Sequence, residues 1–156
     1  MGMTTVGVSE ARRLQTEEGY TYVDVRSVPE FENGHPEGAC SVPLLHLDAA
    51  TRRMQPNPDF LAVMQASFPT DAKLLVGCQM GGRSARAAQL LASAGYETAV
   101  NVDGGFGGRR DPATGQVMAE GWAGAGLPVE AGGGGERGYE ALRGKAAERA
   151  GPAQRR

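Results

Sequence analysis

The sequence predicts an α/β fold with a central, mostly parallel five-stranded sheet and helices on both of its faces. Short apolar segments alternate with segments of helical periodicity along the chain, which is typical of parallel βαβ units. Residues 74–76 are apolar without alternation, as expected of a strand buried on both faces. The chain has 156 residues, of which 40% are hydrophobic; this length and composition are typical of one domain with its own hydrophobic core.

The first half of the chain is expected to supply three strands and three helical segments. Ser9 precedes a helical pattern that ends at Gly19, and Asn57 precedes Pro58, the residue type favoured at the first position of a helix. The expected elements, in order, are a strand at 5–8, helix at 10–18, strand at 20–25, helical turn at 29–33, strand at 38–42, a polar loop, and a helix that Asn57 caps and that continues to about residue 66.

The second half is expected to complete the sheet and to add a hairpin. A proline turn at Pro112, followed by Gly115 and flanked by residues able to pair, predicts a β-hairpin inserted at about 107–120. The expected elements, in order, are a strand at 74–76, a helix at 84–94, a strand at 98–102 and this hairpin.

The domain is expected to span residues 4–130. The run of glycines after Ala131 predicts a flexible linker, so residues 131–156 are expected to form a glycine-rich linker and a basic C-terminal tail. Residues 139–150 contain few apolar side chains, so disorder is expected there at least as much as a helix.

Cys78 stands between the strand at 74–76 and a helix, in the most informative segment of the chain. Gly81 and Gly82 allow the backbone to curl so that several N–H groups point inward, and the helix adds its positive N-terminal end. Such a ring favours thiolate over thiol and would make Cys78 a nucleophile. The residues predicted to form this anion-holding loop after Cys78 are Gln79, Met80, Gly81, Gly82, Arg83 and Ser84.

Other loops are expected to converge on the same cleft. In parallel sheets the site lies beyond the carboxyl ends of the strands, where Arg26, Cys78 and Gly104 all fall. Asp24 and Arg26 are predicted to support the loops around Cys78, with Glu30 or another nearby carboxylate as the partner of Arg26.

Composition argues against several other classes of protein. No apolar run approaches the ~20 residues of a membrane-spanning helix, and the N-terminus lacks the pattern of a secretory signal, so we expect a cytoplasmic protein with no membrane partner. Two cysteines exclude a disulfide scaffold. His35 and His46 are the only histidines, so neither a metal cluster nor a cofactor is expected.

The C-terminal tail is basic but carries no assigned function. Residues 136–156 hold six basic and three acidic side chains, within a chain of net charge −2. Because no aromatic residues alternate with the basic ones, a solvated tail is favoured and nucleic acid is not expected as a partner.

The motifs and their order resemble those of the single-domain rhodaneses, a sulfurtransferase family. The matching segments are Asp24-Val25-Arg26, Glu30-Phe31, Gly34-His35, Gly38-Ala39, Val42-Pro43, Cys78-Gln79-Met80-Gly81-Gly82-Arg83-Ser84, Gly95-Tyr96, Asp103-Gly104-Gly105, Gly121-Trp122 and Ala125-Gly126-Leu127-Pro128-Val129. The resemblance covers residues 23–130 and implies a rhodanese-like fold.

The resemblance also implies a persulfide mechanism. Cys78 would take sulfane sulfur from a small anionic donor such as thiosulfate and pass it to cyanide or a thiol, with a sulfur-carrier protein as a further partner. Inward-facing N–H groups would stabilise the anionic donor and persulfide without a general base. Arg83 would either face the donor's oxygens or hold the loop through backbone carbonyls. His35 is expected to pack or hydrogen-bond.

Two features depart from the family pattern. The hairpin separates Gly105 from Trp122, and Arg109 and Arg110 on it could line the rim of the cleft and attract an anion, although a solvated hairpin is the more ordinary interpretation. Cys40, if close to Cys78, could resolve an oxidised or persulfidated Cys78 into a disulfide; buried packing is the commoner role.

Two alternative functions remain open. Related enzymes of this fold, phosphatases or arsenate reductases, use a cysteine and an arginine around an oxyanion, but their loops have one residue more than the four between Cys78 and Arg83. A non-catalytic docking or regulatory module is the other alternative, and it would often lack the cysteine.

Overall fold

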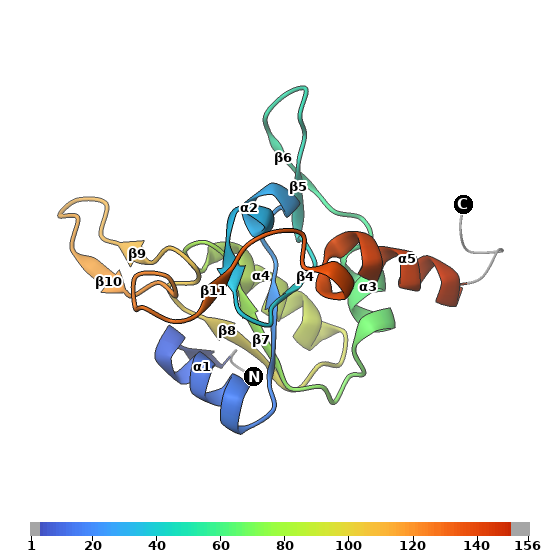
Figure 1. Cartoon of the computed structure of the whole chain (residues 1–156), viewed down its shortest axis with the longest axis horizontal. Coiled ribbons are helices and arrows are strands. Elements are labelled where there is room, and N and C mark those ends of the chain that lie inside the picture. Colours follow the sequence, from blue (N-terminus) through green and yellow to red (C-terminus); the bar gives the residue numbers. More distant parts are fainter. Residues whose placement is uncertain (1–3, 151–156) are drawn as a thin grey trace.

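A five-stranded parallel sheet forms the centre of the computed structural model, which describes residues 4–150 (Figure 1). Its order is β1-β8-β7-β2-β4, and each neighbouring pair is parallel. The strands are β1 (Thr5–Val6), β2 (Thr21–Asp24), β4 (Cys40–Ser41), β7 (Leu74–Gly77) and β8 (Ala99–Val102). The predicted fold class is therefore confirmed.

Helices cover both faces of this sheet. On one face α3 (Phe60–Ser67), α4 (Gly82–Ser93) and α5 (Tyr139–Ala150) pack on the apolar side chains of β2 and β7. On the other face α1 (Val8–Glu17) and the loop that carries Trp122 enclose a second cluster. β7 is buried at each of its residues, because it lies in the middle of the sheet between these two layers.

The first helix begins earlier than expected. α1 starts at Val8 with Gly7 as its N-cap, and no side chain caps it, so Ser9 lies inside the helix. Val8 and Ala11 are both buried against the sheet. Burial of that apolar face decides the start of the helix in place of the capping residue.

α2 (Val28–Asn33) matches the helical turn expected from the sequence. Ser27 and Glu30 form a capping box, in which each side chain satisfies a backbone N–H of the first turn. β3 (His35–Pro36) follows and pairs antiparallel with β11 (Val129–Glu130), which places the segment after α2 beside residues 129–130.

The polar segment after β4 is a hairpin, which the sequence did not predict. β5 (Leu45–Leu47) pairs antiparallel with β6 (Met54–Pro56), and the hairpin projects from the body of the molecule (Figure 1). α3 then begins at Phe60 with Asp59 as its N-cap. Asn57 instead is buried, and its side chain donates to the Pro43 carbonyl at 2.8 Å.

A second hairpin follows the sheet. β9 (Arg109–Arg110) pairs antiparallel with β10 (Val117–Ala119), with an irregular register, and extends to one side of the molecule (Figure 1). It lies between Gly105 and Trp122. Trp122 is fully buried, donates to the Pro128 carbonyl at 2.7 Å and packs edge-on against Tyr22.

The C-terminal segment differs from the linker and tail expected there. A 3₁₀ turn (Gly135–Arg137) leads into α5, which lies along α3. Tyr139 and Leu142 are 7% and 8% exposed and belong to the same core cluster as Cys78. A few apolar residues are enough to stabilise α5, because Tyr139 and Leu142 pack on an apolar surface that the rest of the domain provides. Residues 151–156 of the expected tail lie outside the described residues.

No helix within residues 4–150 is both long and apolar enough to cross a bilayer.

Candidate active site

Cys78 lies directly after β7, where the strand turns into α4. Its side chain is 2% exposed, and Sγ accepts a hydrogen bond from the Gly81 N–H at 3.1 Å. Gly77, just before it, must be glycine because a Cβ would overlap the Tyr22 hydroxyl. The loop therefore bends around the sulfur, as expected from the sequence.

The carbonyl groups of residues 78–80 face the neighbouring segment 104–107. Three N–H groups of the neighbouring segment 104–107 donate to them: Gly104 to Met80 at 3.0 Å, Phe106 to Cys78 at 2.8 Å and Gly107 to Gln79 at 2.9 Å. In a trans peptide the N–H points opposite to the C=O, and the described residues contain no cis bond. The N–H groups of residues 79, 80 and 81 therefore point away from that segment, which suits binding of an anion.

Gly105 makes this arrangement possible. Its φ is +53°, and a Cβ there would overlap the Cys78 carbonyl. Only glycine allows the two loops to approach so closely. The paired glycines of the sequence thus serve the Cys78 loop directly.

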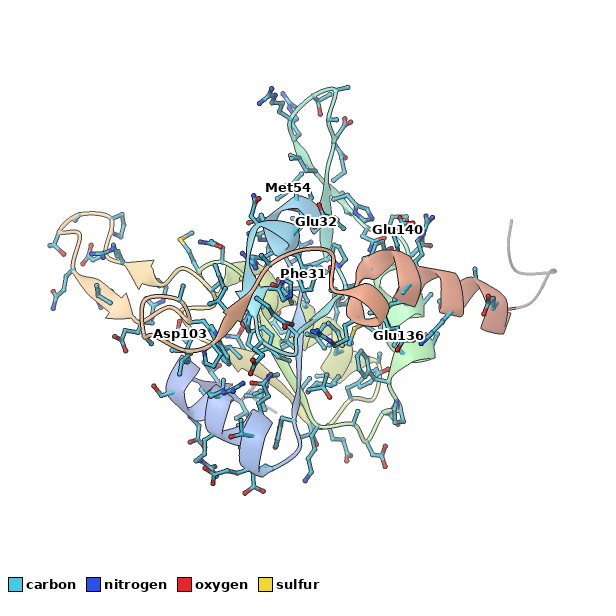
Figure 2. The ribbon with its side chains drawn as sticks, viewed as in Figure 1. Phe31, Glu32, Met54, Asp103, Glu136 and Glu140 are labelled. Atoms are coloured by element: carbon cyan, nitrogen blue, oxygen red, sulfur yellow. The ribbon has the colours of Figure 1, made fainter. Side chains whose placement is uncertain are left out.

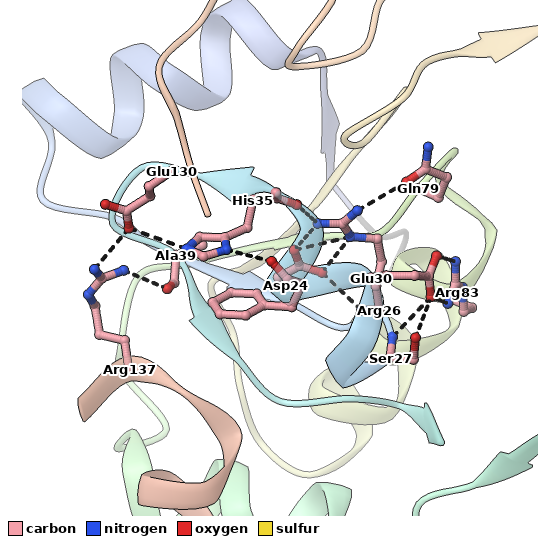
Figure 3. Close-up of polar contacts among 12 residues, drawn as sticks. Asp24, Arg26, Ser27, Glu30, His35, Ala39, Gln79, Arg83, Glu130 and Arg137 are labelled. Atoms are coloured by element: carbon pink, nitrogen blue, oxygen red, sulfur yellow. Dashed lines mark hydrogen bonds and ion pairs between the residues drawn. The ribbon is translucent and has the colours of Figure 1, made fainter. Parts of the chain in front are cut away.

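Arg83 is bound by a carboxylate. Its guanidinium donates to the two oxygens of Glu30 at 2.7 and 3.0 Å, and Glu30 also accepts from Ser27 (Figure 3). Burial tends to raise the pKa of Glu30, but the hydrogen bonds from Arg83 and Ser27 prevail and lower it to about 2. Neither sequence interpretation of Arg83 named this partner.

Arg26 pairs with Asp24, so its partner is the other nearby carboxylate that the prediction allowed and is not Glu30. The two side chains are 3% and 1% exposed, with Nη2 to Oδ2 at 2.7 Å (Figure 3). The guanidinium also donates to the Gly34 carbonyl at 2.6 Å and to Gln79 Oε1 at 3.1 Å, and stacks over Phe106 at 4.5 Å. One buried cation thereby joins β2, α2, the Cys78 loop and the 104–107 segment.

Arg109 and Arg110 have different positions. Arg109 binds both oxygens of Asp103 at 3.0 Å. Asp103, which is labelled in Figure 2, directly precedes Gly104, and the Gly104 N–H contacts the Cys78 loop. This bond lowers the pKa of Asp103. Arg110 donates instead to the Gly115 carbonyl within the hairpin. Only Arg109 is therefore connected with the rim of the site.

Ser84 and Asn101 complete the surroundings of the sulfur. Ser84 Oγ lies 3.4 Å from Cys78 Sγ and 2.6 Å from Asn101 Oδ1, and both residues are buried. Sequence reasoning missed Asn101. The signal was a polar residue between Val100 and Val102, in a strand that is otherwise apolar.

Cys40 lies too far from Cys78 to form the disulfide considered above. In the sheet Cys40 is opposite Val23, which is opposite Val76, so β2 separates the two cysteines and Cys78 lies two residues further on. Two strand spacings are ~10 Å, beyond the ~7 Å limit of Cα separation in a disulfide. Burial raises the pKa of Cys40, as expected of a packing cysteine.

His35 has the packing role predicted for it. Its ring stacks on Phe31 with centroids 3.6 Å apart, and Nδ1 donates to the Phe31 carbonyl at 2.7 Å. Nε2 faces Glu130 at 3.4 Å, and Glu130 in turn binds Arg137 (Figure 3). Within residues 4–150 no group of three or more metal-ligating side chains is found.

Comparison with known proteins identifies the family. The model of the rhodanese-like domain matches residues 7–108. The chain belongs to the rhodanese-like domain family. It is 36% identical over 113 residues to thiosulfate sulfurtransferase 16 of Arabidopsis thaliana, covering 72% of this chain and 82% of that one, and 36% identical to thiosulfate sulfurtransferase 18 of the same plant, covering 67% and 76%.

Solved structures agree with this assignment. The crystal structure of Rv0390 from M. tuberculosis is 28% identical, with a TM-score of 0.68, over 85% of this chain and all of that one. Against several longer relatives the chain spans 51–65% of their length. These names support sulfur transfer at the level of the family, and the matched rhodanese-like region ends at residue 108, immediately before β9.

Proposed function

We propose that this chain is a sulfurtransferase that carries sulfane sulfur as a persulfide on Cys78. The observation that supports this most is the position of Sγ, which accepts the Gly81 N–H in a loop where the carbonyl groups of residues 78–80 are bound by the 104–107 segment. A sulfur atom added to Sγ would extend among N–H groups. Those groups favour its negative charge.

The reaction has two displacement steps. The Cys78 thiolate attacks the outer sulfur of thiosulfate, so that a new S–S bond forms, the S–S bond of thiosulfate breaks, and sulfite leaves with the electron pair. Cyanide or a thiolate then attacks the outer sulfur of the persulfide, and Sγ leaves as a thiolate. The electrons balance without an added oxidant or reductant.

The supporting residues hold the loop in place for these steps. Arg26 and Asp24 fix the Gln79 side chain from a buried position, and Arg83 ties the start of α4 to α2 through Glu30. Gln79 is half-buried and Met80 is 58% exposed, so they form the outer part of the loop. We propose that donor and acceptor reach Sγ past these two residues, and that the acceptor is a thiol, cyanide or a sulfur-carrier protein.

The same chemistry favours a reducing compartment, and we propose the cytoplasm as the location. A reactive thiol stays reduced there. Neither a cofactor nor a metal has a role in the proposed steps.

A steady-state assay tests the proposed function. Reduced protein is mixed with thiosulfate and cyanide, and the formation of thiocyanate is measured. Wild type should turn over, while Cys78→Ser should lose at least ~10³-fold, because serine is far less nucleophilic at neutral pH. Cys40→Ser is the matched control and should retain activity, since Cys40 lies across β2 from the site. Equal rates for wild type and Cys78→Ser would overturn the proposal.

The Arg83–Glu30 ion pair disfavours the oxyanion alternative. A phosphatase or arsenate reductase needs the arginine to bind the oxyanion, and both oxygens of Glu30 already hold this guanidinium. We therefore expect no hydrolysis of an aryl phosphate by wild type. A non-catalytic docking role would be indicated if thiosulfate, other persulfide donors and aryl phosphates all fail to react.

A further inference from the structure

The hydroxyl of Ser84 has more partners than it has protons. It lies 2.6 Å from Asn101 Oδ1, 3.1 Å from the Gly81 carbonyl and 3.4 Å from Cys78 Sγ. Ser84 is fully buried and Asn101 is 6% exposed, so exchange with bulk water does not satisfy these groups. One hydroxyl provides a single donor and two acceptor lone pairs.

The shortest of these contacts decides where the proton lies. Asn101 Oδ1 can only accept, and at 2.6 Å it takes the Ser84 proton. The lone pairs of Ser84 Oγ then remain for Cys78, whose S–H donates to them at 3.4 Å. This order of donors, from Cys78 through Ser84 to Asn101, fits the protonated thiol.

We propose that Asn101 is a positioning residue that controls the ionisation of Cys78 through Ser84. The inference rests on the proposed function in one respect, that Cys78 is the reacting group. When Sγ becomes a thiolate it can only accept, and Ser84 must turn its proton from Asn101 to Sγ. Asn101 opposes this turn, and so favours the thiol in the resting protein.

The Gly81 N–H acts in the opposite direction. It donates to Sγ at 3.1 Å, which favours the thiolate. In the second displacement step Sγ leaves with negative charge, and a hydroxyl proton from Ser84 can then stabilise it. Asn101 and Gly81 thus set the balance between an inert resting thiol and a reactive thiolate.

Other charged groups surround the loop but occur mainly in pairs. The groups near Cys78 from the packed elements are Tyr22 and the ion pairs Asp24–Arg26, Glu30–Arg83 and Asp103–Arg109. Burial raises the pKa of Tyr22 well above its ordinary value, so its phenol stays neutral. A substitution at Asn101 leaves each of these groups in place.

Two apolar variants test the inference in the full chain. Asn101→Val suits a strand between Val100 and Val102, and Asn101→Leu keeps the branched shape of the asparagine side chain. Each removes the shortest of the competing acceptors, so that the Ser84 proton is divided between the Gly81 carbonyl and the thiolate, of which the charged thiolate is the stronger acceptor. The rate of alkylation of Cys78 by iodoacetamide is measured against pH in a Cys40→Ser background, and the midpoint should fall by about one pH unit, a tenfold rise in rate below the midpoint.

The midpoint separates this effect from a merely structural one. A loosened site would raise the plateau rate at high pH without moving the midpoint. In a Ser84→Ala background, Asn101→Val should move the midpoint no further. An unchanged or raised midpoint in the folded single variants, or an undiminished shift without Ser84, would overturn the inference.

Alkylation does not depend on sulfur transfer. If thiocyanate formation fails while the midpoint shifts as expected, the proposed function falls and the control of Cys78 by Asn101 stands. If thiocyanate forms while the midpoint is unmoved, the proposed function stands and the control of Cys78 by Asn101 falls. The melting temperature of each variant shows whether it folds. Because Asn101→Val and Asn101→Leu are two independent variants, one of them can test the inference if the other does not fold.

Discussion

Glu30 stabilises both the start of α2 and the position of Arg83 beside the Cys78 loop. It completes the capping box of α2 and holds Arg83 of α4, 53 residues away. The sequence predicted the helical turn but not the second partner, because spacing along a chain does not indicate which distant carboxylate an arginine meets. The Cys78 loop and α2 are thus connected through Glu30 and Arg83.

The Glu30–Arg83 pair should make stability depend on pH. Its hydrogen bonds hold the pKa of Glu30 at about 2, below the ordinary 4.5, although burial acts the other way. The ionised form therefore stabilises the fold above about pH 4.5, and this contribution is lost as the pH falls through about 2. Glu30→Gln, which can keep the capping box, should lower the free energy of unfolding at neutral pH by about 2 kcal/mol after discounting for partial exposure.

Urea denaturation at several pH values measures this effect. The difference between wild type and Glu30→Gln should disappear near pH 2. Glu10→Gln is the matched control, since Glu10 also pairs with an arginine but on the exposed face of α1, and it should change stability little. A pH-independent difference for Glu30→Gln would contradict the ion-pair explanation.

Arg109 should affect the binding of anions by neutralising Asp103. Without Arg109 the carboxylate of Asp103 would stand unpaired beside the Cys78 loop and repel thiosulfate. We expect Arg109→Ser to raise the KM for thiosulfate by roughly threefold at low salt, an effect that screening reduces at high salt.

A double variant separates neutralisation from direct binding. Asp103→Asn combined with Arg109→Ser should restore the KM for thiosulfate, because the repelling charge is also removed. Arg110→Ser should have no effect, since Arg110 is bonded within the hairpin. If the double variant stays impaired, Arg109 binds the donor itself, as the sequence hypothesis had it.

At the scale of elements, the site depends on two loops that hold each other. The 104–107 segment binds the three carbonyl groups of residues 78–80, and glycine at 105 allows the contact. Gly105→Ala would place a methyl group on the Cys78 carbonyl at a left-handed φ of +53°. We expect thiocyanate formation to fall at least ~10-fold and stability to fall by about 2 kcal/mol.

Gly144→Ala provides the control for that substitution. Gly144 lies in α5, and a Cβ there meets nothing within 4 Å. Alanine should raise stability by about 0.5–1 kcal/mol through helix propensity alone, with unchanged activity. An active, stable Gly105→Ala protein would show that the two loops need not contact each other for function.

Local signals made the Cys78 loop predictable. A buried strand, two glycines and a helix follow one another within residues 74–94, so the sequence alone places the cysteine at a helix start. The partners of Arg26, Arg83 and Ser84 could not be predicted in this way. They depend on which strands are neighbours and on side-chain packing, and the polar segment 45–56 likewise gave no sign of a hairpin.

At the scale of the whole molecule, the domain extends to α5. The apolar residues of α5 are too few to predict a stable helix from the sequence. They are buried because α5 packs against α3 and β4. Arg137 also binds the Ala39 carbonyl at 2.8 Å, which fixes the start of this segment. The sequence could not indicate a docking surface that exists only in the folded protein.

Two leucines test this extent of the domain. Leu142→Ala should lower the free energy of unfolding by about 2–3 kcal/mol, since Leu142 is 8% exposed in the core. Leu90→Ala, at a helix position that is 45% exposed, should cost less than about 1 kcal/mol. Equal small effects in urea denaturation would mean that α5 contributes little to the fold.

The central claim is that Cys78 carries the transferred sulfur. The most direct measurement is the intact mass, with peptide mapping, of the reduced protein after brief treatment with thiosulfate and then with cyanide. We predict a gain of one sulfur atom on the peptide that contains Cys78, and its loss on addition of cyanide. A folded protein whose Cys78 stays unmodified by thiosulfate would contradict the account.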